Sequence, residues 1–409
     1  MKEKIKSEYF DWLFCGLAII LPFSTAIPNI LIGVMLVLFI SQREKIDFSP
    51  LRIPLVYLLF SLFAYLSLKS LINGTFYVDS AIYSRYFFFL VLPVLFLKVK
   101  ALDKVKIAVI VGASAFIIKS LVLILNFYFI FHTLPLGNGE MINKLLILER
   151  PYAGFLALLS ILLSVEQFQN KSKHKWIFII SGILGFGFIL FISARNSLLT
   201  LLLLFFIYLF FYLRLPLVKR IFLLGCILIM IALTAIYNRN FLTRFNIGSD
   251  LKTTLSMSSD LEPRFIIWPC AYELSKQQDF SPFFGFSGES DIRDRLANCY
   301  GVSIKGNDVK RDWFVKERFN THSQFIAIFL GGGLLGLLVF CAFLFISLKN
   351  AFKDFYQFAI VLAIGLFFVF ENVLFRQFGC YIFGFILCFY FRDADKKYIS
   401  KLSRHEVSD

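Results

Sequence analysis

Charged residues are scarce in this sequence. Asp, Glu, Lys and Arg make up 17% of the 409 residues, whereas hydrophobic residues make up 58% and the mean hydropathy is +0.76. A soluble domain carries about a quarter charged residues. The composition therefore excludes a soluble cytosolic enzyme and indicates a membrane protein.

Motifs for nucleotide, redox and metal chemistry are also missing. The sequence contains no Walker phosphate loop, no dinucleotide-binding glycine fingerprint, no His-Glu-x-x-His and no Cys-x-x-Cys, and it has only four His. The apolar stretches lack the series of carboxylates that a proton-driven carrier normally shows. The sequence thus predicts neither a cofactor nor a metal site, and it weakens the case for ion-coupled transport.

Twelve apolar stretches are candidates for membrane helices, because a bilayer core about 30 Å thick needs about 20 apolar residues per crossing. The first two stretches are joined by only residues 24–29, so they form either a helical hairpin or one broken element. The predicted fold is all-α, a polytopic membrane protein with about 12 transmembrane helices. The stretches lie near residues 10–27, 29–41, 54–72, 82–97, 105–131, 152–168, 176–192, 197–213, 220–237, 323–348, 355–371 and 377–391.

Basic residues are concentrated in alternate connecting segments. If the N-terminus is cytoplasmic, more than half of the 42 Lys and Arg fall on inside segments, as the positive-inside rule requires. Both termini are therefore predicted to be cytoplasmic. Topology and contact with anionic membrane lipids explain the net charge of +15, and nucleic acid is not an expected partner. The short outside loops hold only Lys69, Arg85, Lys144, Arg150, Arg195 and Arg376.

One segment is too long and too polar to be a short connection. Residues 238–321 mix 12 basic with 11 acidic residues and contain many turn formers. This composition predicts one long, partly helical periplasmic loop, and loops of this length are usually functional. The predicted division of the chain is N-terminal transmembrane helices 1–9 in residues 1–237, the loop in 238–321, transmembrane helices 10–12 in 322–391 and a cytoplasmic tail in 392–409.

Two of the seven cysteines lie in this loop. Cys270 and Cys299 would face an oxidising compartment, where disulfides form and persist. Spacing alone does not show that two sulfur atoms meet, so the sequence leaves this pairing open.

Two arginines, Arg195 and Arg264, lie on the predicted outer side of the membrane, where they could bind an anionic group. Arg195 lies in a turn between two apolar stretches, where its guanidinium either extends to water or binds two phosphate oxygens. Arg264 follows Pro263 at an expected helix start and shares a helix face with Trp268. A cation–π pair or a surface ion pair is the alternative to substrate binding at Arg264.

His322 is placed at the surface of the membrane. The run Thr321-His322-Ser323-Gln324 ends the long loop, and a glycine-rich membrane stretch with Gly333 and Gly336 follows. A neutral imidazole accepts a proton from a hydroxyl nucleophile at neutral pH. A capping or hydrogen-bonding role is the structural alternative for His322. The glycines would let a helix or a ligand approach the backbone closely.

Glu371 and Arg376 close the eleventh stretch on the same side of the membrane. An ion pair between these two residues is the simpler interpretation. Orientation of a catalytic group by Glu371 is the alternative.

These residues together resemble the superfamily of O-antigen ligases and O-antigen polymerases. The resemblance rests on about twelve spans, one long late loop, His322-Ser323 followed by Gly333-x-x-Gly336, and three further motifs. These are Ser193-Ala194-Arg195, Arg264-x-x-x-Trp268 and Pro282-Phe283-Phe284-Gly285-Phe286-Ser287-Gly288. The resemblance covers residues 190–380 by motif and the first 180 residues by hydropathy.

The resemblance implies an integral-membrane glycosyltransferase of the bacterial inner membrane, with its active site on the periplasmic face. The donor would be a glycan on undecaprenyl diphosphate, and the acceptor a sugar hydroxyl of lipid A core. His322 would be the catalytic residue, and Arg195 and Arg264 would bind the diphosphate. Ser323, Trp268, Gly333, Gly336, Glu371 and Arg376 would support the site.

Three other functions compete with the ligase. A polymerase of the same superfamily would use a second lipid-linked glycan as its acceptor. Members that transfer glycan to protein commonly carry a C-terminal extension, which this chain does not show after its last apolar stretch. A lipid or polysaccharide transporter would need the same helices and no chemistry, so it should tolerate loss of His322.

Overall fold

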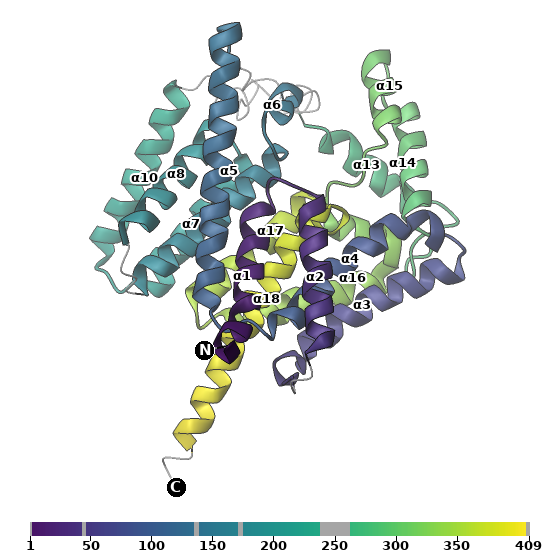
Figure 1. The fold of residues 1–409 in the computed structure, drawn as a ribbon. Helices are drawn as coiled ribbons and strands as arrows, with labels where there is room; N and C mark the ends of the chain where they lie inside the picture. The colour runs from purple at the N-terminus through teal and green to yellow at the C-terminus, as the bar shows by residue number, and fades with distance from the viewer. Residues whose placement is uncertain (1, 43–45, 135–138, 171–174, 238–261, 406–409) are drawn as a thin grey trace. The chain divides into compact units, whose positions relative to one another are not determined.

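The fold is all-helical (Figure 1). The computed structural model describes residues 2–42, 46–134, 139–170, 175–237 and 262–405, and these ranges contain no strand. Each of the twelve predicted stretches overlaps a helix. These helices are α1 (Lys2–Ile20), α2 (Ala26–Ser41), α3 (Pro54–Ile72), α4 (Phe76–Phe96), α5 (Leu102–Phe131), α7 (Arg150–Gln169), α8 (Lys175–Phe191), α9 (Arg195–Ile207), α10 (Leu217–Tyr237), α16 (Gln324–Ala351), α17 (Phe355–Phe370) and α18 (Gln377–His405).

The remaining elements are shorter. A π-helical turn, η3 (Tyr208–Tyr212), extends α9, and α18 continues past its apolar part into the predicted tail. The predicted stretch 10–27 extends too far toward the C-terminus, because α1 ends at Ile20 and a turn separates it from α2. The other short elements are α6 (Gly139–Leu145), α13 (Arg264–Leu274), α14 (Glu289–Ser303), α15 (Asp308–Glu317), η1 (Ser49–Leu51) and η4 (Val373–Phe375).

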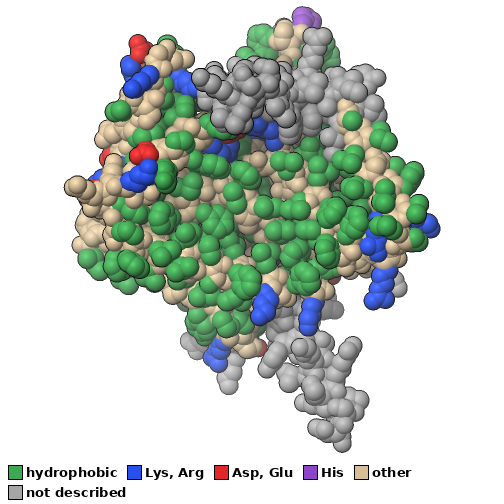
Figure 2. All heavy atoms as spheres, turned by 180° about the vertical axis from the view of Figure 1, so that it is seen from behind, with side chains coloured by type: hydrophobic (Ala, Val, Ile, Leu, Met, Phe, Trp, Pro, Cys, Tyr) green, Lys and Arg blue, Asp and Glu red, His purple; other side chains and the backbone are tan. Residues whose placement is uncertain are grey.

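Six of the described helices are long and apolar enough to cross a membrane. They are α3, α4, α5, α7, α9 with η3, and α16, and four shorter apolar helices accompany them. Figure 2 shows hydrophobic side chains over much of the face that it draws, as expected for a surface in contact with lipid. The protein is therefore a membrane protein, and the full count of twelve crossings stays a prediction.

The chain forms two compact units, each built from three separate stretches of sequence. The first unit comprises Met1–Ile46, Leu95–Asn246 and Ala351–Ala363, and the second comprises Asp47–Val94, Ile247–Asn350 and Ile364–Asp409. The division of the chain at residues 237, 321 and 391 into membrane helices, loop and tail stays a prediction.

Helices of the first unit approach closely at glycines. A Cβ atom at Gly112 of α5 would lie 2.8 Å from the carbonyl oxygen of Ala18 in α1. At Gly154 of α7 it would lie 2.7 Å from Ser197 Oγ in α9. Small residues at helix crossings are typical of membrane proteins, in which close van der Waals packing replaces the hydrophobic effect.

The second unit contains α13–α15, the described helical part of the predicted loop. Their buried side chains form one core with Phe280, Phe286 and Leu330. Leu330 belongs to α16, so the loop core is continuous with a membrane helix. This shared core fixes the loop helices against the start of α16, where His322 lies.

Candidate functional site

Three segments of the second unit bring Arg264, Glu371 and His322 together. Arg264 is the first residue of α13, Glu371 follows α17, and His322 precedes α16. The Arg264 Nη2 atom lies 2.8 Å from Glu371 Oε1, and the other carboxylate oxygen, Oε2, lies 3.6 Å from His322 Nδ1. The Glu371 side chain is 7% exposed and that of His322 is 21% exposed. A nearly buried carboxylate therefore joins an arginine to an imidazole that solvent can reach.

The end of α17 holds the guanidinium of Arg264. Its Nε atom donates a hydrogen bond of 3.2 Å to the carbonyl oxygen of Phe370, and Nη2 donates to the same oxygen. Nη1 forms an ion pair with Glu262. The sequence favoured Arg376 as the partner of Glu371, whereas the structure pairs this carboxylate with Arg264. Arg376 lies exposed directly after η4.

His322 has an unusual backbone conformation. Its φ angle is +45°, in the left-handed region that residues other than glycine rarely adopt. The Asn320 side chain accepts a hydrogen bond of 3.0 Å from the His322 backbone N–H. Such a conformation persists only where the surrounding structure imposes it, and it is enriched at functional sites.

A buried polar network imposes this conformation on both sides of His322. The backbone oxygen of Thr321 accepts a hydrogen bond of 3.0 Å from Trp268 Nε1, and its hydroxyl lies 3.0 Å from Asn372 Nδ2. On the other side, Gln324 Oε1 accepts a hydrogen bond of 2.9 Å from the backbone N–H of Leu374. Because Thr321 and Gln324 are buried and bonded, the peptide between them has little freedom to move.

The supporting residues predicted from the sequence fall into different roles. Trp268 stacks on Phe370 at a centroid distance of 6.5 Å while it donates to Thr321. Ser323 precedes α16, and its hydroxyl accepts a hydrogen bond of 3.5 Å from the Ile326 N–H, which is a helix-capping contact. Gly333 interrupts α16 with φ +61°, and a Cβ atom there would lie 2.2 Å from the Phe283 backbone. A Cβ atom at Gly336 would meet only ordinary contacts of 3.5 Å or more.

Arg195 belongs to the first unit. It is the first residue of α9 and is partly exposed. The turn before it is fixed by Ser193, whose φ angle is +52°, and by the close packing of Ala194 on Gly154. The predicted role of Arg195 in binding a phosphate rests on the sequence motif.

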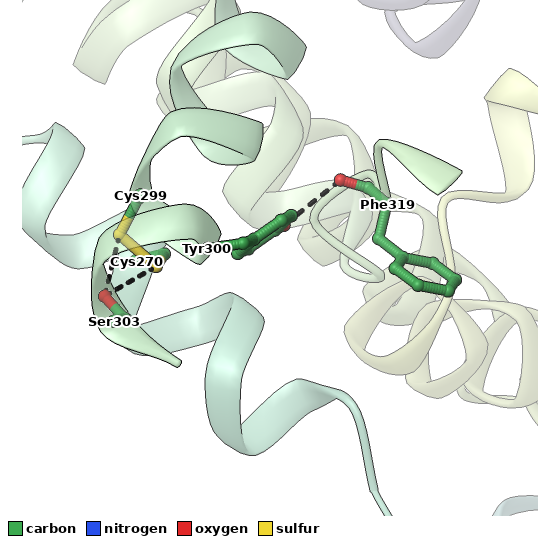
Figure 3. The surroundings of a disulfide bond; sticks show 5 residues. All are labelled: Cys270, Cys299, Tyr300, Ser303 and Phe319. Carbon is green, nitrogen blue, oxygen red and sulfur yellow. Dashed lines mark hydrogen bonds between the residues drawn. A yellow bond between two sulfur atoms is a disulfide. The ribbon is translucent and has the colours of Figure 1, made fainter. Parts of the chain in front are cut away.

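A disulfide joins α13 to α14 through Cys270 and Cys299 (Figure 3). Both sulfur atoms lie near the hydroxyl of Ser303, at 3.5 and 3.4 Å. The hydroxyl of Tyr300, the residue after Cys299, donates a hydrogen bond of 3.1 Å to the carbonyl oxygen of Phe319, three residues before His322. The disulfide therefore links α13, which carries Arg264, to α14, which contacts Phe319 in the segment just before His322.

Replacing both Cys270 and Cys299 by serine is expected to lower the stability of the second unit. The bond closes a loop of 29 residues, and removal of such a bond costs about 2–5 kcal/mol. Thermal melting of the detergent-purified protein should show the decrease, and added reductant should reproduce it in the unmodified protein. Cys226→Ser, at an exposed free cysteine of α10, is the matched control and should melt normally.

The start of α14 carries a buried acidic pair. Both carboxylate oxygens of Asp79 accept hydrogen bonds, of 3.0 and 2.9 Å, from the backbone N–H groups of Glu289 and Ser290. Burial raises the pKa of Glu289 to about 8, Arg293 opposes the shift, and Asp79 adds to it. Glu289 also lines a cavity of about 30 Å³ together with Lys69 and Tyr83.

Stability is expected to fall as the pH rises from about 5 to about 8. Folded Glu289 keeps its proton up to about pH 8, whereas the unfolded chain releases it near 4.5. The folded state therefore binds one more proton in this interval. Glu289→Gln should flatten this part of the melting-temperature profile. Glu273→Gln, at an exposed carboxylate of α13, should leave the profile unchanged.

The arrangement around His322 suits proton transfer to or from a hydroxyl. A carboxylate beside Nδ1 favours the tautomer that carries its proton on Nδ1, so the lone pair of Nε2 is available to accept a proton. The ion pair with Arg264 holds the Glu371 side chain in place. Within the described ranges, no group of three His, Cys, Asp or Glu side chains is arranged to hold a metal ion.

Several site residues were not recognised as such in the sequence. Asn320, Thr321, Gln324 and Asn372 hold His322, and Glu262 binds Arg264. The sequence feature that could have identified them is the cluster of uncharged polar residues on each side of His322, at the edge of an apolar stretch. That cluster indicates buried hydrogen bonds but not their partners.

Comparison with known families agrees with the resemblance in the sequence. Residues 180–341 match the family model described as O-antigen ligase. The matched range contains Arg195, Arg264 and His322. No curated protein matches the chain. The match agrees with the predicted superfamily over this range, and it supports an enzyme of the general ligase or polymerase kind.

Proposed function

We propose that this protein is an O-antigen ligase of the bacterial inner membrane, which transfers a glycan from undecaprenyl diphosphate to a sugar hydroxyl of lipid A core. The observation that carries this proposal is the contact between Arg264, Glu371 and His322 at the end of a membrane helix. It combines a positive group for a diphosphate with an imidazole for a hydroxyl. The family match covers two of these three residues.

In the proposed reaction, His322 Nε2 accepts the proton of the acceptor hydroxyl. The hydroxyl oxygen attacks the anomeric carbon, and the bond from that carbon to the phosphate oxygen breaks. The undecaprenyl diphosphate leaves with the electron pair of that bond, and the configuration of the anomeric carbon inverts in this single displacement. Positive groups that face the developing phosphate charge lower the barrier.

Arg264 is proposed to bind the diphosphate through Nη1, which is now paired with Glu262. Nη2 and Nε remain on Glu371 and Phe370, so one guanidinium holds the carboxylate and receives a phosphate oxygen. Glu262 is 18% exposed and can turn toward water when the phosphate replaces it. Arg195 is proposed as a further phosphate ligand on the basis of its motif.

Deleting the gene and separating the envelope glycans on a gel tests the function. A ligase is supported if all long-chain lipopolysaccharide disappears and lipid-linked polymer accumulates. Core with a single repeat unit indicates the polymerase instead, and an unchanged pattern eliminates both. Arg195→Ala should fail to restore the ligated product while the protein still reaches the membrane.

A further inference from the structure

The turn formed by Ser281–Phe286 is attached to the middle of a membrane helix. α16 is interrupted at Gly333, and the backbone N–H groups of Leu334 and Leu335 donate to the carbonyl oxygens of Pro282 and Phe283, at 2.8 and 3.3 Å. In return, the Phe286 N–H donates to the Leu330 carbonyl oxygen at 2.8 Å. The turn thus fills the break in α16.

The position of Gly333 sets the depth of this turn. Residues 325–348 carry no Asp, Glu, Lys, Arg or His, and at about 1.5 Å per residue this run is about 36 Å long. Gly333 lies about 12 Å from the start of the run. A straight helix along the membrane normal that places any 30 Å of this run in the hydrocarbon core would hold Gly333 about 6 Å or more below the surface of that core.

The backbone of the turn suits hydrocarbon. The Gly285 N–H donates to the Ser281 carbonyl oxygen at 2.6 Å, and the Phe284 N–H donates to Ser281 Oγ at 3.3 Å. Pro282 has no N–H group. Lys69 donates to the carbonyl oxygen of Phe286 in the turn and to that of Gly331 near the end of the first half of α16. Non-helical backbone at this depth requires such bonds within the protein.

The side chains at the tip of the turn are apolar and exposed. Phe283 is 65% exposed and Phe284 is 55% exposed, and beside them on α16 lie Leu334 at 40% and Leu335 at 45%. In water this patch would be costly, whereas at the depth of Gly333 it meets acyl chains. The exposed apolar side chains and the depth of the turn therefore both indicate contact with lipid acyl chains.

We infer that residues 281–286 form a re-entrant segment whose Phe283–Phe284 tip inserts between the acyl chains of the bilayer. This tip anchors the Pro282–Gly288 motif, and with it the start of α14, at a fixed depth. Part of the segment 238–321, which was predicted to lie wholly outside the membrane, thus returns into it. The inference is independent of the proposed enzymatic activity.

The test places trifluoromethyl-phenylalanine at position 284 of the full chain in phospholipid nanodiscs. Fluorine NMR then measures relaxation by dissolved oxygen, which concentrates in hydrocarbon, and by a nickel chelate, which stays in water. The same label replaces Leu338 of α16, 58% exposed, as the lipid control, and Val309 of α15, 83% exposed, as the water control.

The oxygen-to-nickel relaxation ratio at residue 284 is expected to exceed that at residue 309 clearly and to approach that at residue 338, which lies about 7.5 Å further along α16 than Gly333. A ratio like that of residue 309 would place the tip in water and overturn the inference. Weak relaxation by both agents would show that another part of the chain or a second copy covers the tip, and this result would overturn it as well. At position 284 the label retains the ring of phenylalanine, and positions 338 and 309 are exposed, at 58% and 83%, so that a larger side chain fits there.

Discussion

Replacing His322 by asparagine is expected to reduce glycan transfer by about 10²–10⁴-fold, the usual contribution of a general base. Asparagine tolerates the left-handed backbone that φ +45° requires, and it cannot accept a proton from a hydroxyl at neutral pH. The loss would therefore reflect the missing base rather than a changed backbone. Transfer from a purified lipid-linked glycan to core acceptor in nanodiscs measures the effect.

The chain offers a close control for this substitution. His132, at the end of α5, also has a left-handed backbone, with φ +52°, and it is exposed. His132→Asn makes the same chemical change under the same backbone demand and should leave transfer unchanged. If His322→Asn retained full activity, transfer would need no imidazole base at this position and the proposed role of His322 would be wrong. Equal losses in both variants would point to a general effect on folding.

The positions of the helices were largely predictable from the sequence. Runs of apolar residues between basic segments located α3 with its observed bounds, Pro54–Ile72, because membrane helices satisfy their backbone within the segment. The break in α16 was not predicted, although three consecutive glycines mark it. Glycine explains why the chain can turn at residue 333, but the turn at 281–286 that fills the break comes from a distant part of the sequence.

Individual residues of the candidate site were predictable from the sequence, but the contacts between them and the polar residues that hold His322 were not. His322 and Arg264 stood out because an imidazole and a guanidinium sit at the edges of apolar stretches. The carboxylate partner of Arg264 is 107 residues away, whereas Arg376 is only five residues from Glu371 and looked the simpler choice. Reasoning from sequence favours partners that are close along the chain. The packing of α13 against the end of α17 instead pairs Glu371 with Arg264.

Replacing Arg264 by lysine is expected to reduce transfer by about 10²-fold or more, as for removal of one donor that stabilises transition-state charge. Lysine keeps the positive charge but has a single point donor, so it cannot hold Phe370 and Glu371 and also receive a phosphate oxygen. Transfer kinetics in nanodiscs measure the effect. Arg311→Lys, in an exposed ion pair with Asp308 on α15, is the matched control and should change activity little.

A double-mutant cycle with Glu371→Gln separates positioning from phosphate binding. If Arg264 acts only by holding Glu371 against His322, the double variant should be as active as the less active of the two single variants. Either substitution alone would already remove the function that Arg264 and Glu371 perform together. If Arg264 also binds the diphosphate, Arg264→Lys should cost further activity in the Glu371→Gln background and should raise the KM for the lipid-linked donor. Independent, additive losses with an unchanged donor KM would contradict both roles, since they require that Arg264 and Glu371 neither cooperate nor contact the donor.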